Sequence, residues 1–195
     1  TYTKAAVGGV SGRVLKPGDV LQAGAAKMTG TPLALPSEWI PQYTDTIELR
    51  VMAGPQDVLF EAGALSVMCA GEYKVTNDAD RMGYRLEGPQ LKHLGKADIV
   101  SDALCRGAVQ VPGNGQPIIM MADCGTTGGY TKIATVIGPD FSRIAQAKPD
   151  DVIKFRLCSD EEAVNALREE SLRYEQLAAQ VANPAGQQTR PSVSA

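Results

Sequence analysis

The sequence contains no excess of basic residues and no long apolar run. It has 19 lysine and arginine residues against 22 aspartate and glutamate residues, a net charge of −3, so we expect no basic face for nucleic acid. No stretch approaches the roughly 18 apolar residues that span a membrane, and residues 1–20 lack the basic and apolar regions of a secretory signal. These absences predict a cytoplasmic protein with neither nucleic acid nor a membrane as a partner.

Cysteine pairs of the metal-binding type are also missing. None of the four cysteines belongs to a C-x-x-C pair, so the usual zinc motifs are excluded and no metal site is predicted. A disulfide framework is not expected in a chain of this length without an export signal, so the thiols should be reduced. The four positions are Cys69, Cys105, Cys124 and Cys158.

Residues for triad hydrolysis are scarce. His93 is the only histidine, and a lone histidine is more often structural than catalytic. Ser101 and Asp102 could hold it in a triad-like set, but the sequence has no nucleophile elbow. Cys124 is a candidate nucleophile without a nearby base. Triad hydrolysis is therefore not predicted.

The chain is rich in short apolar stretches separated by glycine- and proline-bearing turns. Its 195 residues, 44% hydrophobic and 21% charged, suffice for one domain with a core. Closely spaced strands with few helices favour an α+β, mainly β, barrel-like or sandwich-like fold. The expected strands are 47–51, 73–76, 84–86, 107–111, 117–122, 132–137 and 151–157, and the expected helices are 57–69, 140–147 and 160–181.

The C-terminal part has a helix-start signal and a polar tail. Ser159 precedes Glu162 by three residues, which predicts a capping box. We therefore assign residues 159–182 to a C-terminal helix. Residues 183–195 are rich in proline, glycine, serine and glutamine and are predicted to be a disordered tail. Residues 16–19 and 148–151 resemble each other and are interpreted as one turn used twice.

The segment Asp80–Pro89 concentrates two arginines, two carboxylates and a tyrosine. If residues 84–86 are extended, Tyr84 and Leu86 point to one face and Arg85 to the other, while Arg81 lies on the loop. An arginine fork suits a carboxylate or a phosphate. The alternative is a hairpin with a surface arginine–aspartate pair, which composition alone favours.

The segment Asp123–Lys132 reads DCGTTGGYTK. Successive glycines allow backbone N–H groups to approach an anionic ligand, and Thr126, Thr127 and Lys132 add hydroxyls and a charge. The spacing is not that of a Walker loop. The alternative is a plain turn between strands.

The segment 107–117 reads GAVQVPGNGQP and predicts a hairpin bracketed by Gln110 and Gln116. A glutamine on an inward face can hydrogen-bond an amide substrate through both ends of its side chain. The alternative is a hairpin with solvated glutamines.

Taken in order, these segments resemble a known family. The stretches DRMGYRLEGP and TTGGYTKIATVI, together with GAVQVPGNGQP and the flanking GGVSGRVLKPGDVL, are similar to the carboxyltransferase A/B family. That family is also called allophanate hydrolase subunit 2, the KipI antagonist (KipA), or the C subunit of the ATP-dependent 5-oxoprolinase, and it is related to a region of urea carboxylase. The resemblance covers about residues 1–158, which we predict to be one domain.

The resemblance implies a cyclophilin-like β-barrel and a hydrolase subunit that opens a cyclic amide, 5-oxoproline to glutamate, with ATP. It implies two partners, the KipI-like B subunit of the oxoprolinase, together with its A subunit. Two alternatives stay open: a biotin-dependent carboxyltransferase acting on urea or a related amide, with biotin on a separate carrier, and a regulatory KipI-binding module. Family members normally carry an upstream half, so the chain is expected to be a C-terminal fragment.

The resemblance also implies site residues. The expected catalytic residues are Arg81 and Lys132 on an anionic group, and Asp123, which would orient a group or accept a proton. One of the two glutamines, Gln110 or Gln116, would form hydrogen bonds to the amide group of the substrate. The expected substrate-binding residues are Tyr84, Arg85, Gln110, Gln116, Thr126, Thr127, Gly128 and Tyr130. The family pattern has glutamine where this chain has Gly125, and glycine where it has Asp150.

Overall fold

The computed structural model describes residues 1, 3–24 and 35–182. Its contacts divide the chain into two units, Thr1–Ala34 and Leu35–Ala195. The first unit contains a short 3-10 helix, η1 (Thr3–Ala5), and a turn in which Asp19 accepts hydrogen bonds from the Arg13 guanidinium at 2.7 and 2.8 Å. The predicted tail, residues 183–195, lies outside the described residues.

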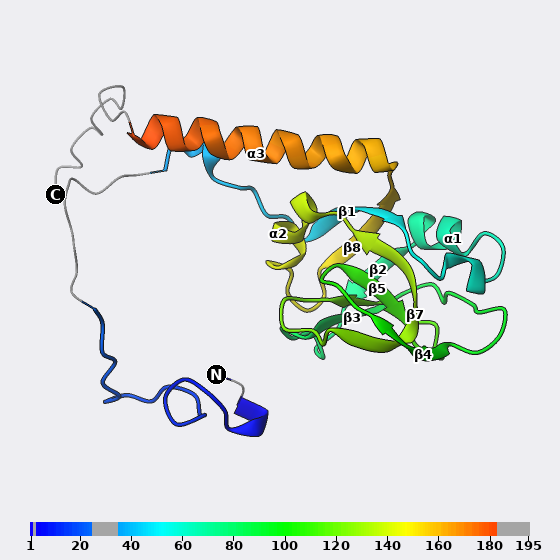
Figure 1. The fold of residues 1–195 in the computed structure, drawn as a ribbon, viewed down its shortest axis with the longest axis horizontal. Coiled ribbons are helices and arrows are strands. Elements are labelled where there is room, and N and C mark those ends of the chain that lie inside the picture. Colours follow the sequence, from blue (N-terminus) through cyan, green and yellow to red (C-terminus); the bar gives the residue numbers. More distant parts are fainter. Residues whose placement is uncertain (2, 25–34, 183–195) are drawn as a thin grey trace. The chain divides into compact units, whose positions relative to one another are not determined.

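The second unit is built around a closed β-barrel (Figure 1). The strands follow the order β1-β8-β2-β3-β6-β5-β7, and β1 pairs again with β7, so seven strands form a ring to which β4 adds at β7. Among the strands of the described residues, β1 and β8 alone pair in parallel. The strands are β1 (Thr46–Ala53), β2 (Glu72–Val75), β3 (Gly83–Glu87), β4 (Asp98–Ala103), β5 (Ala108–Val111), β6 (Ile118–Met120), β7 (Thr127–Val136) and β8 (Val152–Leu157).

The helices are few, as predicted. The α-helices are α1 (Ala64–Ala70), α2 (Phe141–Ile144) and α3 (Asp160–Ala182), and the 3-10 helices of the second unit are η2 (Ser37–Trp39), η3 (Asp57–Leu59) and η4 (Gly138–Asp140). No helix among the described residues is both long and apolar enough to cross a membrane. The prediction of a mainly β barrel with a C-terminal helix is confirmed.

The alternation of apolar side chains explains the barrel core. In β1, Ile47, Leu49 and Val51 are buried while their neighbours are not, because successive side chains of a strand point to opposite faces. Strand β5 is buried on both faces, since it lies between β6 and β7. Each Å² of apolar surface removed from water stabilises the fold by about 25 cal/mol. This core is therefore the main source of stability.

Three predicted elements differ from those in the structure. The helix expected over 57–69 is split, because Gly63 has a left-handed φ of 86° just before α1 and Phe60 forms a β-bridge with His93. The helix expected over 140–147 is only the short α2. The strand expected over 132–137 begins five residues earlier, at Thr127, because β4 supplies a partner for its first half. Strand β4 itself was not predicted.

The two similar turns have the same hydrogen bonds. In each turn the aspartate carboxylate accepts the lysine N–H, Asp19 from Lys16 at 2.7 Å and Asp151 from Lys148 at 2.9 Å. The third residue of each turn has a left-handed φ, 92° for Gly18 and 74° for Asp150. The interpretation of one turn used twice is confirmed, and Asp150 occupies a conformation that ordinarily favours glycine.

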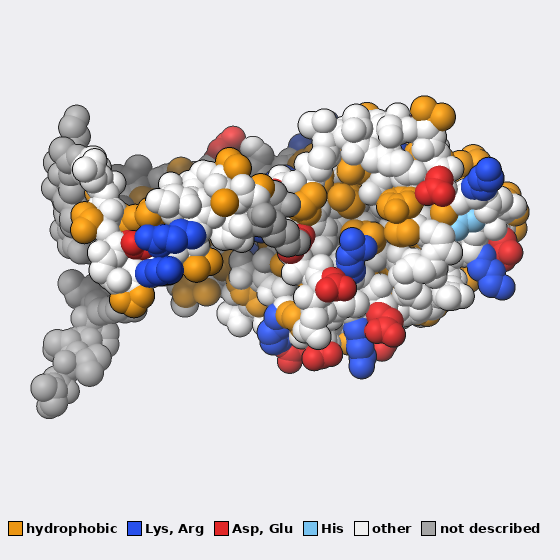
Figure 2. Space-filling model, turned by 90° about the horizontal axis from the view of Figure 1, so that it is seen from below, with side chains coloured by type: hydrophobic (Ala, Val, Ile, Leu, Met, Phe, Trp, Pro, Cys, Tyr) orange, Lys and Arg blue, Asp and Glu red, His pale blue; other side chains and the backbone are white. Residues whose placement is uncertain are grey.

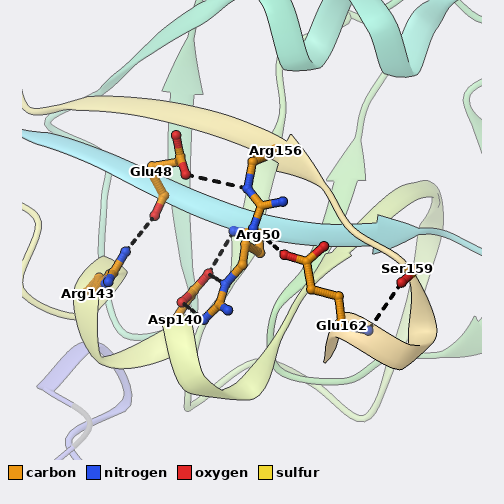
Figure 3. Close-up of polar contacts among 7 residues, drawn as sticks. All are labelled: Glu48, Arg50, Asp140, Arg143, Arg156, Ser159 and Glu162. Atoms are coloured by element: carbon orange, nitrogen blue, oxygen red, sulfur yellow. Dashed lines mark hydrogen bonds and ion pairs between the residues drawn. The ribbon is translucent and has the colours of Figure 1, made fainter. Parts of the chain in front are cut away.

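A polar network joins the barrel to the start of α3 (Figure 3). Ser159 Oγ accepts the Glu162 N–H at 3.2 Å, so the predicted helix N-cap is confirmed. The Glu162 carboxylate binds Arg156 of β8 rather than the Ser159 N–H, so only one half of the predicted capping box is formed among the described residues. Arg50 of β1 donates to Asp140 through Nε, at 2.9 Å, and through Nη2, at 2.7 Å. Asp140 is 1% exposed, so this pair is a buried ionic link.

Helix α3 is held at two places. Near its start, Ala163 and Ala166 are buried against Ile137. Further along, the Trp39 indole N–H donates to Gln180 Oε1 at 2.8 Å, and the Arg173 guanidinium lies over the indole ring, 5.3 Å from its centroid. The helix is therefore part of the second unit.

Candidate functional site

Arg81 and Asp123 lie side by side where two loops meet. The Asp123 N–H donates to the Arg81 carbonyl at 2.8 Å, and the Arg81 guanidinium binds the Asp123 carboxylate through two nitrogens, at 2.6 and 2.9 Å. The side chains are 77% and 51% exposed. Water and salt screen such an exposed pair, so it contributes little to stability and is available for binding.

The ion pair defines the charge state of Asp123. The hydrogen bonds from Arg81 lower the pKa of the Asp123 carboxyl below its ordinary value, so the group is ionised and weakly basic at neutral pH. This direction favours the orienting role over the proton-accepting role among those expected for Asp123.

Tyr84 and Arg85 lie on opposite faces of β3, as expected. Tyr84 is half-buried and packs against the barrel core, whereas Arg85 is exposed. Leu86 is buried on the same side as the core. Among the described residues no side-chain partner binds Arg85, so its guanidinium faces solvent.

The two glutamines differ in what their side chains do. Gln116 accepts the Gly88 N–H at 2.8 Å and donates to the Gly88 carbonyl at 3.1 Å, so both ends of its amide hold the backbone. Gln110 is 5% exposed and donates to the Tyr130 carbonyl at 3.2 Å. Its Oε1 accepts no hydrogen bond from the described residues. Because no buried side-chain oxygen or nitrogen among them lacks a partner, this Oε1 is accessible to solvent. Gln110 is therefore better placed than Gln116 to form a hydrogen bond to an amide substrate.

Lys132 is buried in a hydrogen-bond network at the edge of the barrel. Its side chain is 5% exposed, and its Nζ donates to Asp102 Oδ2 at 2.7 Å and to the Ala103 carbonyl at 2.9 Å. Gln56 completes the network, because its Nε2 donates to Asp102 at 3.2 Å and its Oε1 accepts the Lys132 N–H at 3.1 Å. A buried ammonium needs such partners.

Sequence reasoning missed Gln56 and the pairing of Asp102 with Lys132. Asp102 lies on β4, whose residues are mostly exposed, so no apolar alternation marked that strand. The sequence indicated Asp102 only as a possible partner of His93. In the structure, His93 Nε2 instead lies 2.9 Å from Thr131 Oγ1, and its ring packs on Phe60 at 4.4 Å between centroids.

The pairing with Lys132 makes a prediction about Asp102. The hydrogen bond from Lys132, with further ones from the Ala103 N–H and Gln56, lowers the Asp102 pKa below 3.8. Replacing Lys132 with methionine should raise that pKa toward 3.8, because the largest cause is gone. An NMR titration of the Asp102 carboxyl measures the change. The Asp140 carboxyl, whose pKa is affected by burial and by Arg50 rather than by Lys132, is the control. An unchanged Asp102 pKa in the variant would contradict the pairing.

The glycine-rich segment is a strand rather than an anion-binding loop. Thr127, Gly128 and Tyr130 pair with β4, and neither Gly128 nor Gly129 has the positive φ of a backbone nest. Over residues 127–132 the chain therefore forms neither of the two arrangements that the sequence left open, a loop that approaches an anionic ligand or a plain turn between strands. Gly128 has a packing role, because a Cβ there would lie 2.5 Å from Gln110 Nε2.

The predicted residues thus form separate groups. Arg81 is bound by Asp123 on the loops beside β3 and β6, whereas Lys132 is bound by Asp102 between β7 and β4. Thr126 directly precedes β7, and its carbonyl accepts the N–H of Leu104, which directly follows β4, at 2.9 Å. Figure 2 shows acidic and basic side chains interspersed on the barrel face seen there, with hydrophobic side chains between them. The described residues include no group of three or more potential metal-ligating acidic, cysteine or histidine side chains.

The fold corresponds to part of a solved structure of a much longer chain. The structure superposes on that of the Kluyveromyces lactis urea amidolyase with a TM-score of 0.76, at 24% identity, over 94% of this chain and 12% of that chain. At this identity the likeness shows the fold alone.

Sequence comparison gives the family. Residues 1–157 match the carboxyltransferase domain, subdomain A and B, and the chain therefore belongs to this family. It is 36% identical over 178 residues to the C subunit of the 5-oxoprolinase of Escherichia coli, covering 91% of this chain and 56% of that protein. It is 29% identical over 174 residues to a putative urea carboxylase of Emericella nidulans, covering 84% of this chain and 14% of that protein. The chain thus spans about half the length of the 5-oxoprolinase relative.

Proposed function

We propose that the protein acts as the C subunit of an ATP-dependent 5-oxoprolinase, which opens 5-oxoproline to glutamate while ATP is hydrolysed to ADP and phosphate. The observation that carries this proposal is the 36% identity to the corresponding 5-oxoprolinase subunit over 91% of the chain. The proposed partners are the KipI-like B subunit, together with the A subunit. The proposed setting is the cytoplasm.

The chain's own residues would bind and orient the cyclic amide. The unpaired Oε1 of Gln110 can accept the lactam N–H, because the other end of that side chain is fixed on Tyr130. Arg81 uses Nε and Nη2 for Asp123, which leaves Nη1 to donate to an anionic group such as the substrate carboxylate. Asp123 would hold the guanidinium in place for this contact.

The described residues do not fit an ATP site of their own. The sequence has no Walker motif, Gly128 and Gly129 are in a strand, and Lys132 is already bound by Asp102. We therefore place ATP on another part of the assembly and derive no step through it from this chain.

The proposal is tested by reconstitution. The full-length protein would be combined with the A and B subunits and supplied with 5-oxoproline and ATP, and both glutamate and ADP would be measured. Turnover that needs all three proteins supports the proposal. Turnover of urea with carboxybiotin instead would support the alternative, a biotin-dependent carboxyltransferase, which the similarity to urea carboxylase favours. A complex that changes a kinase's activity without any turnover would support the KipI-binding module.

Arg81→Ala should lower turnover of the reconstituted enzyme at least ~10-fold if the guanidinium contacts charge that develops in the transition state. Stability should change little, because the pair with Asp123 is exposed. The matched control is Arg168→Ala on α3, whose side chain donates only to Asn165 in the described structure. Wild-type turnover by Arg81→Ala would remove Arg81 from the site.

A further inference from the structure

Helix α3 continues well beyond the turns that pack against the barrel. Its buried residues among those described, Ala163 and Ala166, both lie in the first two turns of the helix. From residue 167 to residue 181 every described side chain is exposed or half-buried, although Trp39 contacts the helix at Gln180. The later turns therefore present a surface that folding of the barrel does not use.

One face of these turns carries a stripe of mostly apolar side chains. Its members follow one another at alternating steps of three and four residues, which keeps them on one face of a helix. The same alternation forms the seam along which two helices pair in a coiled coil. Much of the stripe is open to solvent, because its largest side chain, Tyr174, is 62% exposed. The α3 stripe consists of Val164, Leu167, Ser171, Tyr174, Ala178 and Val181.

We propose that the α3 stripe binds a second copy of this chain as an antiparallel helix pair. A twofold axis midway between Ser171 and Tyr174 makes the stripe complementary to itself, because both copies then offer the same surface. Large side chains meet small ones in two of the three kinds of layer, which allows close packing. The layers are Val164 against the partner's Val181, Leu167 against the partner's Ala178, and Ser171 against the partner's Tyr174.

Charges beside the stripe favour the antiparallel pair over a parallel one. In the antiparallel pair, Arg168 lies beside Glu175 of the partner subunit, and the twofold axis makes this contact twice. Within the described structure neither side chain is held in an ion pair, and Arg168 donates only to Asn165 at 3.3 Å. A parallel pair would instead bring Glu170 beside Glu175 of the partner subunit, and like charges in such flanking positions repel.

The helix pair is independent of the proposed site. The stripe contains none of the residues placed there, so its binding requires neither 5-oxoproline nor ATP, and dimer formation and turnover are separate measurements. Two helices bury a small interface, so the dimer should form and dissociate with concentration. Neutralising one exposed charge, as in Arg168→Ala, changes such a contact only slightly, so the test uses charge reversal.

Sedimentation velocity of the full chain over a roughly hundredfold range of concentration measures the pair. We expect monomer at the lowest concentration and dimer at the highest. Arg168→Glu and Glu175→Arg should each weaken the dimer at least ~10-fold, because two attractive contacts become repulsive. An equimolar mixture of the two variants should dimerise as wild type does, since each reversed charge then meets its opposite on the other copy.

A matched pair of variants tests the apolar stripe itself. Tyr174→Asp should abolish the dimer, because it places a charge in the central layers. Leu172→Asp is the control, since Leu172 is 56% exposed on the same helix but lies outside the stripe, and its dimer should equal that of wild type. Circular dichroism checks that each variant keeps its helix content.

Three results would overturn the proposal. The first is a wild-type chain that stays monomeric at every concentration. The second is a loss of the dimer in Leu172→Asp as large as that in Tyr174→Asp, because the stripe would then not be the contact. The third is a mixture of Arg168→Glu and Glu175→Arg that remains monomeric, because these two positions would then not meet across an antiparallel pair.

Discussion

Replacing Asp140 with alanine is expected to lower the free energy of unfolding by about 3–5 kcal/mol. Asp140 is 1% exposed and accepts three hydrogen bonds from Arg50: from the backbone N–H at 2.8 Å, from Nε at 2.9 Å and from Nη2 at 2.7 Å. Its removal leaves a partly buried guanidinium and a backbone donor without their acceptor, which costs more than the pair itself contributes. Urea unfolding followed by circular dichroism measures the difference.

The matched control is Glu48→Ala, on the same strand. Glu48 is 61% exposed and lies 3.6 Å from Arg156, so its loss should cost less than about 1 kcal/mol. Equal effects of the two substitutions would show that burial of the Arg50–Asp140 pair is energetically unimportant.

The same pair predicts a dependence on pH. Burial raises the pKa of Asp140, but the hydrogen bonds and charge of Arg50 outweigh it, and the pKa in the folded protein lies below 3.8. A depressed carboxyl pKa contributes stability above the unfolded value, and this contribution is lost as the pH falls through the folded value. The stability difference between wild type and Asp140→Asn should therefore be full at neutral pH and shrink below pH 3.8.

Gly54→Ala is the second substitution with a large expected effect, a loss of about 3 kcal/mol. A Cβ at Gly54 would lie 2.3 Å from the Lys132 carbonyl oxygen and 2.7 Å from the Ala134 nitrogen. These are backbone atoms of β7, so relief requires the end of β1 to move away from that strand. Their pairing closes the barrel, and the Gly54 N–H also donates to the Ile133 carbonyl at 2.8 Å.

Gly95→Ala is the control for this substitution, because a Cβ there would meet nothing within 4 Å. It should change the free energy of unfolding by no more than about 0.5 kcal/mol. Urea unfolding of both variants separates crowding at the barrel seam from any general effect of alanine. A Gly54→Ala variant as stable as wild type would mean that β1 and β7 tolerate separation.

Local patterns were sufficient for much of the fold. The alternation of Ile47, Leu49 and Val51 predicted β1, the Pro112–Gly115 turn predicted the hairpin of β5 and β6, and Ser159 predicted the start of α3. Each of these signals acts within a few residues, where side-chain direction and turn geometry are decided. Strand β4 carries no such signal, since its residues are mostly exposed, and it exists because β7 offers a partner.

The candidate site was predictable only in its residue types. The sequence indicated that Arg81, Asp123 and Lys132 carry charge in a glycine-bearing context. It did not indicate that Arg81 binds Asp123, which lies 42 residues away and outside the Asp80–Pro89 segment. It could not indicate that Gln116 is occupied by Gly88 while Gln110 keeps an acceptor, because the two glutamines look alike in sequence. Their different partners lie 28 and 20 residues away along the chain.

The sequence by itself determined a mainly β domain of the carboxyltransferase A and B family, the position of its C-terminal helix and the residues to examine. Those features depend on short-range alternation, turn chemistry and ordered motifs. Tertiary structure alone decided how the barrel closes and which carboxylate binds each cation. These outcomes depend on pairing between strands that are distant in sequence, and a pairing partner is not encoded in either strand separately.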